Sequence, residues 1–205
     1  MKVDSLGVDL LSLSGSKIYG PKSSGVLYVR NKDLIAPILH GGEQEFGMRA
    51  GTEDVAQIVG FAKALEIARE QAEKETVRLA ELQNYFFDEL KKNIADVKVN
   101  GSIHERVPNN INISIPGISG ERIIIELDAR GICASSKSAC REDDGEGSHV
   151  IAAIRKDQKS GSSKIEGSVR FTMGRTTTKK EIDKTIFEFS EIVGKIKKFD
   201  ESLVG

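Results

Sequence analysis

The chain has 205 residues, of which 39% are hydrophobic and 30% charged, as is ordinary for a globular protein of one large domain or two small ones. Its net charge of -1 argues against binding to nucleic acid or to an anionic membrane surface. No apolar run approaches the roughly 20 residues that span a bilayer, and acidic residues interrupt the N-terminal apolar stretch, so we expect no signal peptide. Two cysteines are too few for a disulfide framework, which favours a reducing cytoplasm.

The first third of the chain predicts two strands. Residues 8–13 are mostly apolar and run into small residues, which predicts a buried strand that ends in a loop. Residues 25–30 follow turn-forming residues and predict a second strand. A polar, glycine-rich loop is expected at residues 40–51.

A long helical stretch follows this loop. Thr52 is the expected helix N-cap, since acidic residues follow it in the first turn. Apolar residues then recur at helical spacing to about residue 93, either in one helix or in two helices that break near Lys74. A long helix with a changing apolar face often links two domains, so we expect a domain boundary within this stretch.

The second half alternates between strands and helices and predicts an α/β chain whose later part is α+β. Ser119 is expected to cap a helix that Gly131 stops, and Thr178 with Glu181 forms a capping box ahead of an amphipathic helix. The remaining expected elements are strands at 97–99, 111–115 and 169–173, a brief apolar strand at Cys133, a short helix at 149–155, and polar loops at 135–148 and 156–167.

Lys17 is the first candidate for chemistry, because it follows a strand and lies among small residues. Such a position has room for a flat cofactor, and Ser14 and Ser16 could donate hydrogen bonds to a phosphate. The alternative is a surface lysine in a β-turn. Thr52 is the second candidate, because a helix N-terminus suits an anion such as phosphate, although Thr52 could simply cap its helix.

Cys140 lies in the small and polar segment ASSKSACRED, beside Lys137 and Arg141. Exposure and positive charge favour a reactive thiolate. Cys133 stands between Ile132 and Ala134 and is expected to be a small buried hydrophobic residue. No histidine pair accompanies the cysteines at zinc-ligand spacing, so we expect no metal site.

Arg170 lies in the strand segment GSVRFTMGR, where it is either a bidentate clamp for a carboxylate or a charge on a solvated edge strand. His40, His104 and His149 are isolated from one another in the sequence and show no catalytic spacing. We expect each histidine to be a surface or structural residue.

Taken together and in order, six segments resemble the cysteine desulfurases, which are pyridoxal-phosphate (PLP) enzymes of the class V aminotransferase group. They are VDLLSLSGSKIYGPK, GVLYVR, GGEQEFGMRAGTEDVAQIVGFAKAL, NNINISI, SSKSAC and SVRFTMGRTTTKKEID. The resemblance implies the fold of type I PLP-dependent transferases. Residues 1–70 would be the end of the large PLP-binding domain, and residues 71–205 the small C-terminal α+β domain with the cysteine loop.

The resemblance also implies roles for matching residues. Lys17 matches the lysine that binds PLP covalently, Ser14 a residue that contacts the PLP phosphate, and Thr52 a residue that reaches the phosphate of the neighbouring subunit in a homodimer. Cys140 matches the cysteine that takes sulfur from L-cysteine as a persulfide, and Arg170 the arginine that binds the substrate carboxylate. The implied products are L-alanine and sulfur for an acceptor protein, as in iron–sulfur cluster assembly.

Two positions depart from the family pattern, since Ser16 replaces the usual histidine and Ser23 replaces a usual glycine. The family's chains also begin far upstream of the lysine, where residues that stack on PLP and face its ring nitrogen lie. The chain could therefore be a fragment, one half of a split enzyme that needs an N-terminal half, or a degenerate product. The rival functions are another class V enzyme, such as a selenocysteine lyase or an aminotransferase, and a non-catalytic interaction module. The SSKSAC segment argues against an aminotransferase.

Overall fold

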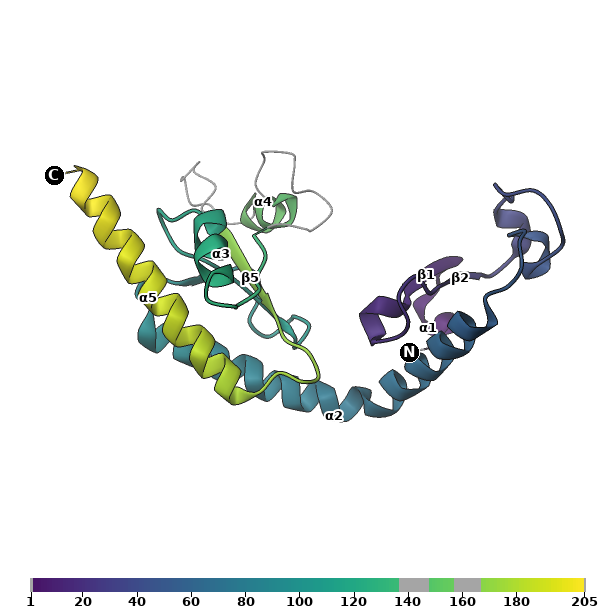
Figure 1. The fold of residues 1–205 in the computed structure, drawn as a ribbon, viewed down its shortest axis with the longest axis horizontal. Helices are drawn as coiled ribbons and strands as arrows, with labels where there is room; N and C mark the ends of the chain where they lie inside the picture. Colours follow the sequence, from purple (N-terminus) through teal and green to yellow (C-terminus); the bar gives the residue numbers. More distant parts are fainter. Residues whose placement is uncertain (1, 137–147, 157–166, 205) are drawn as a thin grey trace. The chain divides into compact units, whose positions relative to one another are not determined.

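The structure, a computed structural model, describes residues 2–136, 148–156 and 167–204 (Figure 1). The chain divides into two compact units, Met1–Glu73 (unit 1) and Lys74–Gly205 (unit 2). The division falls inside the helix α2 (Val55–Asn93). That the units correspond to a large and a small domain stays a prediction.

Unit 1 contains a two-stranded antiparallel sheet ahead of α2. The strands β1 (Leu10–Ser14) and β2 (Gly25–Val29) pair from Leu10 opposite Val29 to Ser14 opposite Gly25. The other short elements of the unit are α1 (Val3–Leu6), η1 (Gly15–Ile18), η2 (Lys32–Leu34) and η3 (Glu45–Gly47).

The strand expected at residues 8–13 is present, but it is not buried. In β1 only Leu11 is partly buried, and among residues 2–73 only Gly15 and Phe61 are buried. The expectation of burial is therefore wrong for the described part of the chain. A two-stranded sheet buries its faces only when a second layer covers them, and unit 1 supplies little of that layer.

Helix α2 begins at Val55, so the prediction that Thr52 caps it is wrong. The Asp54 carboxylate accepts a hydrogen bond from the Gln57 backbone N–H at 3.2 Å, which places Asp54 at the N-cap. Thr52 is exposed and precedes the helix. The helix then runs unbroken for 39 residues, so the alternative of two helices broken near Lys74 is also wrong.

Unit 2 is built on a three-stranded antiparallel sheet in the order β3-β4-β5. The predicted strands are confirmed within one residue, as β3 (Lys98–Val99), β4 (Asn110–Ser114) and β5 (Ser168–Thr172). The helices of the unit are the second half of α2 with α3 (Gly120–Asp128), α4 (His149–Lys156) and α5 (Lys179–Val204). This arrangement confirms the α+β character of the later part. The loops expected at 135–148 and 156–167 lie mostly outside the described residues.

The core of unit 2 is formed by one face of this sheet and the helices α2, α3 and α5. The rings of Phe171 in β5 and Phe86 in α2 are 5.3 Å apart, and the Phe171 ring lies 5.6 Å from that of Phe189 in α5. Around them packs one cluster of buried residues, which includes Phe87, Leu90, Ile111, Ile113, Ile123, Leu127, Val169, Ile182, Ile186 and Ile192.

The predicted signals at helix ends in unit 2 are largely confirmed. The Thr178 N–H donates to Glu181 Oε2 at 2.8 Å, and the Glu181 N–H donates to Thr178 Oγ1 at 3.3 Å, which completes the capping box ahead of α5. The hydrogen bonds from the Thr178 backbone and hydroxyl lower the pKa of the Glu181 carboxyl. Ser119 is the N-cap residue of α3, although its side chain makes no capping bond, and Gly131 follows the helix with a left-handed φ of 73°.

Candidate functional site

Lys17 lies in the tight turn η1 at the end of β1. The hydroxyl oxygens of Ser14 and Ser16 are 3.0 Å apart, and both residues and Lys17 are exposed. One short segment thus presents a primary amine and two hydroxyls. An amine can attack a carbonyl carbon, and hydroxyls can donate to anionic oxygens.

Close packing holds the backbone of this turn. Gly15 is buried, and its N–H donates to the Ser24 carbonyl at 2.9 Å, while the Gly20 N–H donates to the Gly15 carbonyl at 2.8 Å. A Cβ at position 15 would lie 2.0 Å from Ser24 Oγ and 3.1 Å from a ring carbon of Phe61. A larger residue at position 15 would have to displace the Ser24 hydroxyl and crowd Phe61, so close packing holds the backbone of the turn while Lys17 is exposed.

Thr52 is not brought together with Lys17. It lines a cavity of about 470 Å³ between the loop ahead of α2, the strand β2 and the first turns of α2, and the lining residues do not include Ser14, Ser16 or Lys17. The charged residues in the lining are mostly acidic: Glu45, Glu53, Asp54 and Arg49. Contact of Thr52 with the phosphate of a second subunit's cofactor stays a prediction.

The structure tests the prediction for Cys133 but not the prediction for Cys140. Cys133 is exposed and lies outside any strand, so the prediction that it is buried in a brief strand is wrong. Its neighbours Ile132 and Ala134 pack against the core of unit 2, and in extended chain the residue between two inward residues points outward. Cys140 lies outside the described residues, and its role stays a prediction.

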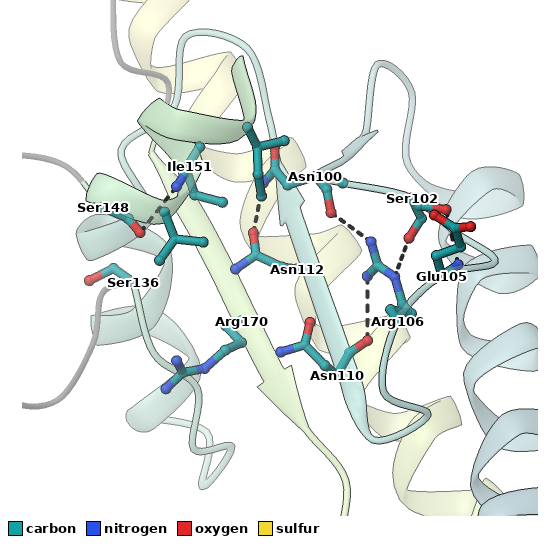
Figure 2. Close-up of a pocket in the computed structure, with 13 residues that line it drawn as sticks. Asn100, Ser102, Glu105, Arg106, Asn110, Asn112, Ser136, Ser148, Ile151 and Arg170 are labelled. Atoms are coloured by element: carbon teal, nitrogen blue, oxygen red, sulfur yellow. Dashed lines mark hydrogen bonds between the residues drawn. The ribbon is translucent and has the colours of Figure 1, made fainter. Parts of the chain in front are cut away.

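Arg170 stands at the centre of β5, between β4 on one side and Ser135 on the other. It is opposite Asn112 of β4, and it exchanges backbone hydrogen bonds with Ser135 at 2.7 and 3.0 Å. The position of its Cα atom is therefore well fixed. The Arg170 side chain lines a cavity of about 520 Å³ on one face of the sheet (Figure 2).

This cavity lies on the polar face of the sheet. Because side chains alternate along a strand, β4 directs Ile111 and Ile113 into the core and Asn110 and Asn112 to the opposite face. Other lining residues are Asn100, Ser102, Glu105, Ser136, Ser148 and Ile151 (Figure 2). Sequence analysis did not single out Asn112, although polar residues at every second position of NINIS were a readable signal.

Arg106 also lines the cavity, but its guanidinium is engaged with the backbone. It donates to the carbonyls of Asn100 and Ser102, each at 2.6 Å, and lies 5.2 Å from the centroid of the Phe87 ring. Burial lowers the pKa of Arg106. Arg106 therefore stabilises the loop between β3 and β4. In the described part of the chain no hydrogen bond or ion pair engages the Arg170 guanidinium, so Arg170 is the cation available to a bound anion.

Among residues 2–136, 148–156 and 167–204, no group of three or more His, Cys, Asp and Glu side chains is placed to hold a metal ion. None of the helices formed by these residues is long and apolar enough to cross a bilayer.

Comparison with known proteins relates these features to a family. The profile of the family described as "Aminotransferase class-V" matches residues 1–185. The chain belongs to the class V aminotransferase family. The match includes both Lys17 and Arg170, so the two candidate regions described above are parts of one family pattern.

Curated proteins that are similar to this chain include several named cysteine desulfurase. The chain is 45% identical over 197 residues to "Cysteine desulfurase IscS" of Dictyoglomus turgidum. The aligned residues make up 96% of this chain and 49% of that protein. It is 41% identical over 190 residues to "Cysteine desulfurase" of a Nostoc strain, and this alignment covers 93% of this chain and 46% of that protein. The chain thus spans about half the length of the curated relatives it matches.

Solved structures agree with the class V assignment. A "NifS-like protein" superposes with a TM-score of 0.80 at 29% identity, over 95% of this chain and 48% of that chain. A NifS-like protein from Rickettsia africae superposes with a TM-score of 0.78 at 29% identity, over 95% of this chain and 50% of that chain. These similarities confirm the predicted α/β fold class, shared with NifS-like proteins.

Proposed function

We propose that this chain is part of a PLP-dependent cysteine desulfurase. The observation that carries the proposal is its 45% identity, over 96% of its length, to a protein of that name. In the proposed reaction, L-cysteine and the Cys140 thiol give L-alanine and a persulfide on Cys140. The carbon–sulfur bond of the substrate breaks and a sulfur–sulfur bond forms, so the step balances without an added oxidant. A sulfur-acceptor protein, as in iron–sulfur cluster assembly, then takes the terminal sulfur.

The turn at Lys17 presents groups that suit the aldehyde and the phosphate of PLP. The exposed Lys17 amine suits covalent attachment to its aldehyde, and the hydroxyls of Ser14 and Ser16, 3.0 Å apart, suit its phosphate. Bound PLP would supply the electron sink for breaking bonds at the substrate carbon. The Arg170 guanidinium, which no described residue engages, would bind the substrate carboxylate.

We also propose that unit 1 is the end of the large domain and unit 2 the small domain, with the boundary near residues 70 and 71. The enzyme would act in the cytoplasm as a homodimer in which Thr52 reaches the phosphate bound by the neighbouring subunit. Thr52 lines a cavity whose lining does not include Lys17, which is consistent with contact between subunits.

The test is production of alanine and sulfide from L-cysteine with PLP and a reducing thiol. It uses the 205-residue chain alone, and the same chain with a polypeptide that carries the rest of the relatives' length. We expect negligible turnover by the chain alone, because catalysis needs all groups held in register at once. We expect turnover with the complementing polypeptide.

Two cysteine variants sharpen this test. Cys140→Ser should abolish sulfide production, whereas Cys133→Ser should leave it nearly unchanged, although Cys133 is also an exposed thiol. Equal loss in both variants would contradict the role of Cys140. Robust turnover by the chain alone would contradict the need for further polypeptide. Absence of turnover under every condition would favour a non-catalytic interaction module.

A further inference from the structure

The cavity on the polar face of unit 2 contains a second uncommitted donor beside Arg170. Asn112 is the residue directly opposite Arg170 in the register of β4 and β5. Side chains of opposed residues emerge on the same face of a sheet, with Cβ atoms about 5 Å apart. Both side chains line the same cavity (Figure 2).

Asn100 fixes the orientation of the Asn112 amide. The Asn100 Nδ2 donates to Asn112 Oδ1 at 2.7 Å and to Ser114 Oγ at 2.9 Å. Asn100 itself is 9% exposed and Ser114 is 1% exposed, so this network is rigidly packed. Because the Asn112 oxygen is turned to Asn100, its Nδ2 group is on the opposite side of the amide (Figure 2). No residue in the described part of the chain accepts a hydrogen bond from that group.

We propose that the Asn112 amide nitrogen is a second donor to the α-carboxylate of the amino-acid substrate, alongside the Arg170 guanidinium. This inference rests on the proposed function for the identity of the ligand. A carboxylate has more acceptor sites than a bidentate arginine occupies, so an amide N–H can bind one of its oxygens without displacing the arginine. Asn112 is thus a binding residue that fixes how the carboxylate lies.

The charges around the cavity agree with an anionic ligand. The described part of its lining contains two guanidinium groups, of Arg106 and Arg170, and one carboxylate, of Glu105. Arg106 is held by backbone carbonyls, and Glu105 is exposed to solvent. Among the described lining residues, the Arg170 guanidinium and the Asn112 amide are therefore two opposed donors that can face an anionic ligand, and the side chains of Asn110 and Ser136 line the same cavity.

The direct test is NMR of the 205-residue chain labelled with ¹⁵N, followed through the Asn112 side-chain amide and the Arg170 Nε signals. L-alanine, the proposed product, is the probe, and L-alaninamide, which lacks the carboxylate, is its control. We expect both signals to shift saturably with L-alanine and not with L-alaninamide. A shift of Arg170 without Asn112, or of neither signal, would overturn the proposal.

Matched variants separate an effect at position 112 from a change in the net charge of the chain. Asn112→Asp keeps an oxygen facing Asn100 but replaces the donor with a second oxygen, and we expect it to weaken L-alanine binding at least about 10-fold. Asn84→Asp makes the same change of charge at an exposed position of α2 and should leave binding unchanged. Circular dichroism of each variant checks that the fold is retained. Equal affinity of the folded Asn112→Asp variant and the unmodified chain would contradict the proposal.

The complemented enzyme distinguishes this inference from the proposed function. There, Asn112→Asp should raise KM for L-cysteine at least about 10-fold with a smaller change in kcat, since the lost bond holds the substrate in both ground and transition state. Turnover with an unchanged KM in this variant would overturn the inference and leave the desulfurase proposal intact. L-alanine binding through Asn112 without any turnover would support the inference on Asn112 and contradict the desulfurase proposal.

Discussion

The two units of the chain differ in how they treat their apolar residues. Unit 2 buries them in one cluster formed by its sheet and the helices α2, α3 and α5, where residues such as Ile111, Ile113 and Phe189 are 0% exposed. Unit 1 leaves most of its large apolar side chains exposed, including Leu27 at 54% and Ile58 at 48%. Burial of apolar surface is the main source of folding free energy. Unit 2 thus contains its own source of stability, whereas we expect unit 1 to need further polypeptide over its sheet and helix.

Hydrogen exchange in the 205-residue chain should show the largest difference between the units. Amides in β4 and β5 can exchange only through global unfolding, because their strands line the core. Amides in β1 and β2 should exchange through local opening, since a two-stranded sheet without cover is marginal. We expect at least about a thousand-fold slower exchange in β4 and β5. Equal protection of the two sheets would contradict the comparison.

Two substitutions of isoleucine by alanine test the same contrast with matched chemistry. Ile113→Ala removes a side chain that is 0% exposed from the core of unit 2. It should lower the free energy of unfolding by about 2–5 kcal/mol. Ile58→Ala in α2 of unit 1 acts on a side chain that is 48% exposed, and it should change stability by less than about 0.5 kcal/mol. Urea denaturation of both variants measures the difference, and a reversed order would show that unit 1 has a core of its own.

Substitution of two glycines of unit 2 by alanine should change the stability in opposite directions, because their surroundings are packed differently. At Gly120 in α3 a Cβ would lie 2.4 Å from the carbonyl oxygen of Ser168, so Gly120→Ala should destabilise by about 1–3 kcal/mol. At Gly194 in α5 a Cβ would meet nothing within 4 Å, so Gly194→Ala should stabilise by roughly 0.5–1 kcal/mol through helix propensity. Thermal unfolding of both variants would reveal a wrong sign at either position.

The capping box of α5 should give a smaller effect than the loss of a core side chain. Thr178→Ala removes the hydroxyl cap and should cost about 1 kcal/mol. The hydrogen bonds from Thr178 hold the pKa of Glu181 below its usual value, so the folded state favours the charged carboxylate. The resulting stabilisation is present above the unfolded-state pKa and is lost as pH falls through the lower, folded-state pKa. Unfolding curves across that acidic range should show a weaker pH dependence in Glu181→Gln, and an unchanged dependence would contradict the assignment.

The sequence predicted elements best where a local pattern and tertiary packing agree. The alternation of NINIS and the capping box at Thr178 are local signals, and the structure has both β4 and α5. Thr52 failed as a cap because Asp54, two residues later, competes for the same role and accepts the hydrogen bond from Gln57. Local propensity alone does not separate two neighbouring capping residues.

Burial was harder to predict because it depends on what covers an element. The apolar run before Ser14 indicates a buried strand, yet the described chain places no full layer over β1. Cys133 was expected inside because its neighbours are apolar, but the alternation of side chains turns it outward. The Asn112 amide was missed for a similar reason, since its register with Arg170 depends on the pairing of two strands that are separated in the sequence by α3 and α4.

The most direct test of the desulfurase account is the site of covalent PLP attachment. The 205-residue chain with its complementing polypeptide is incubated with PLP, reduced with borohydride, digested and mapped by mass spectrometry. We predict a pyridoxyl group on Lys17, which is lost in Lys17→Ala and retained in Lys22→Ala, a neighbouring lysine beyond the same turn. A label on Lys22 or any other lysine, or no label on Lys17, would contradict the account.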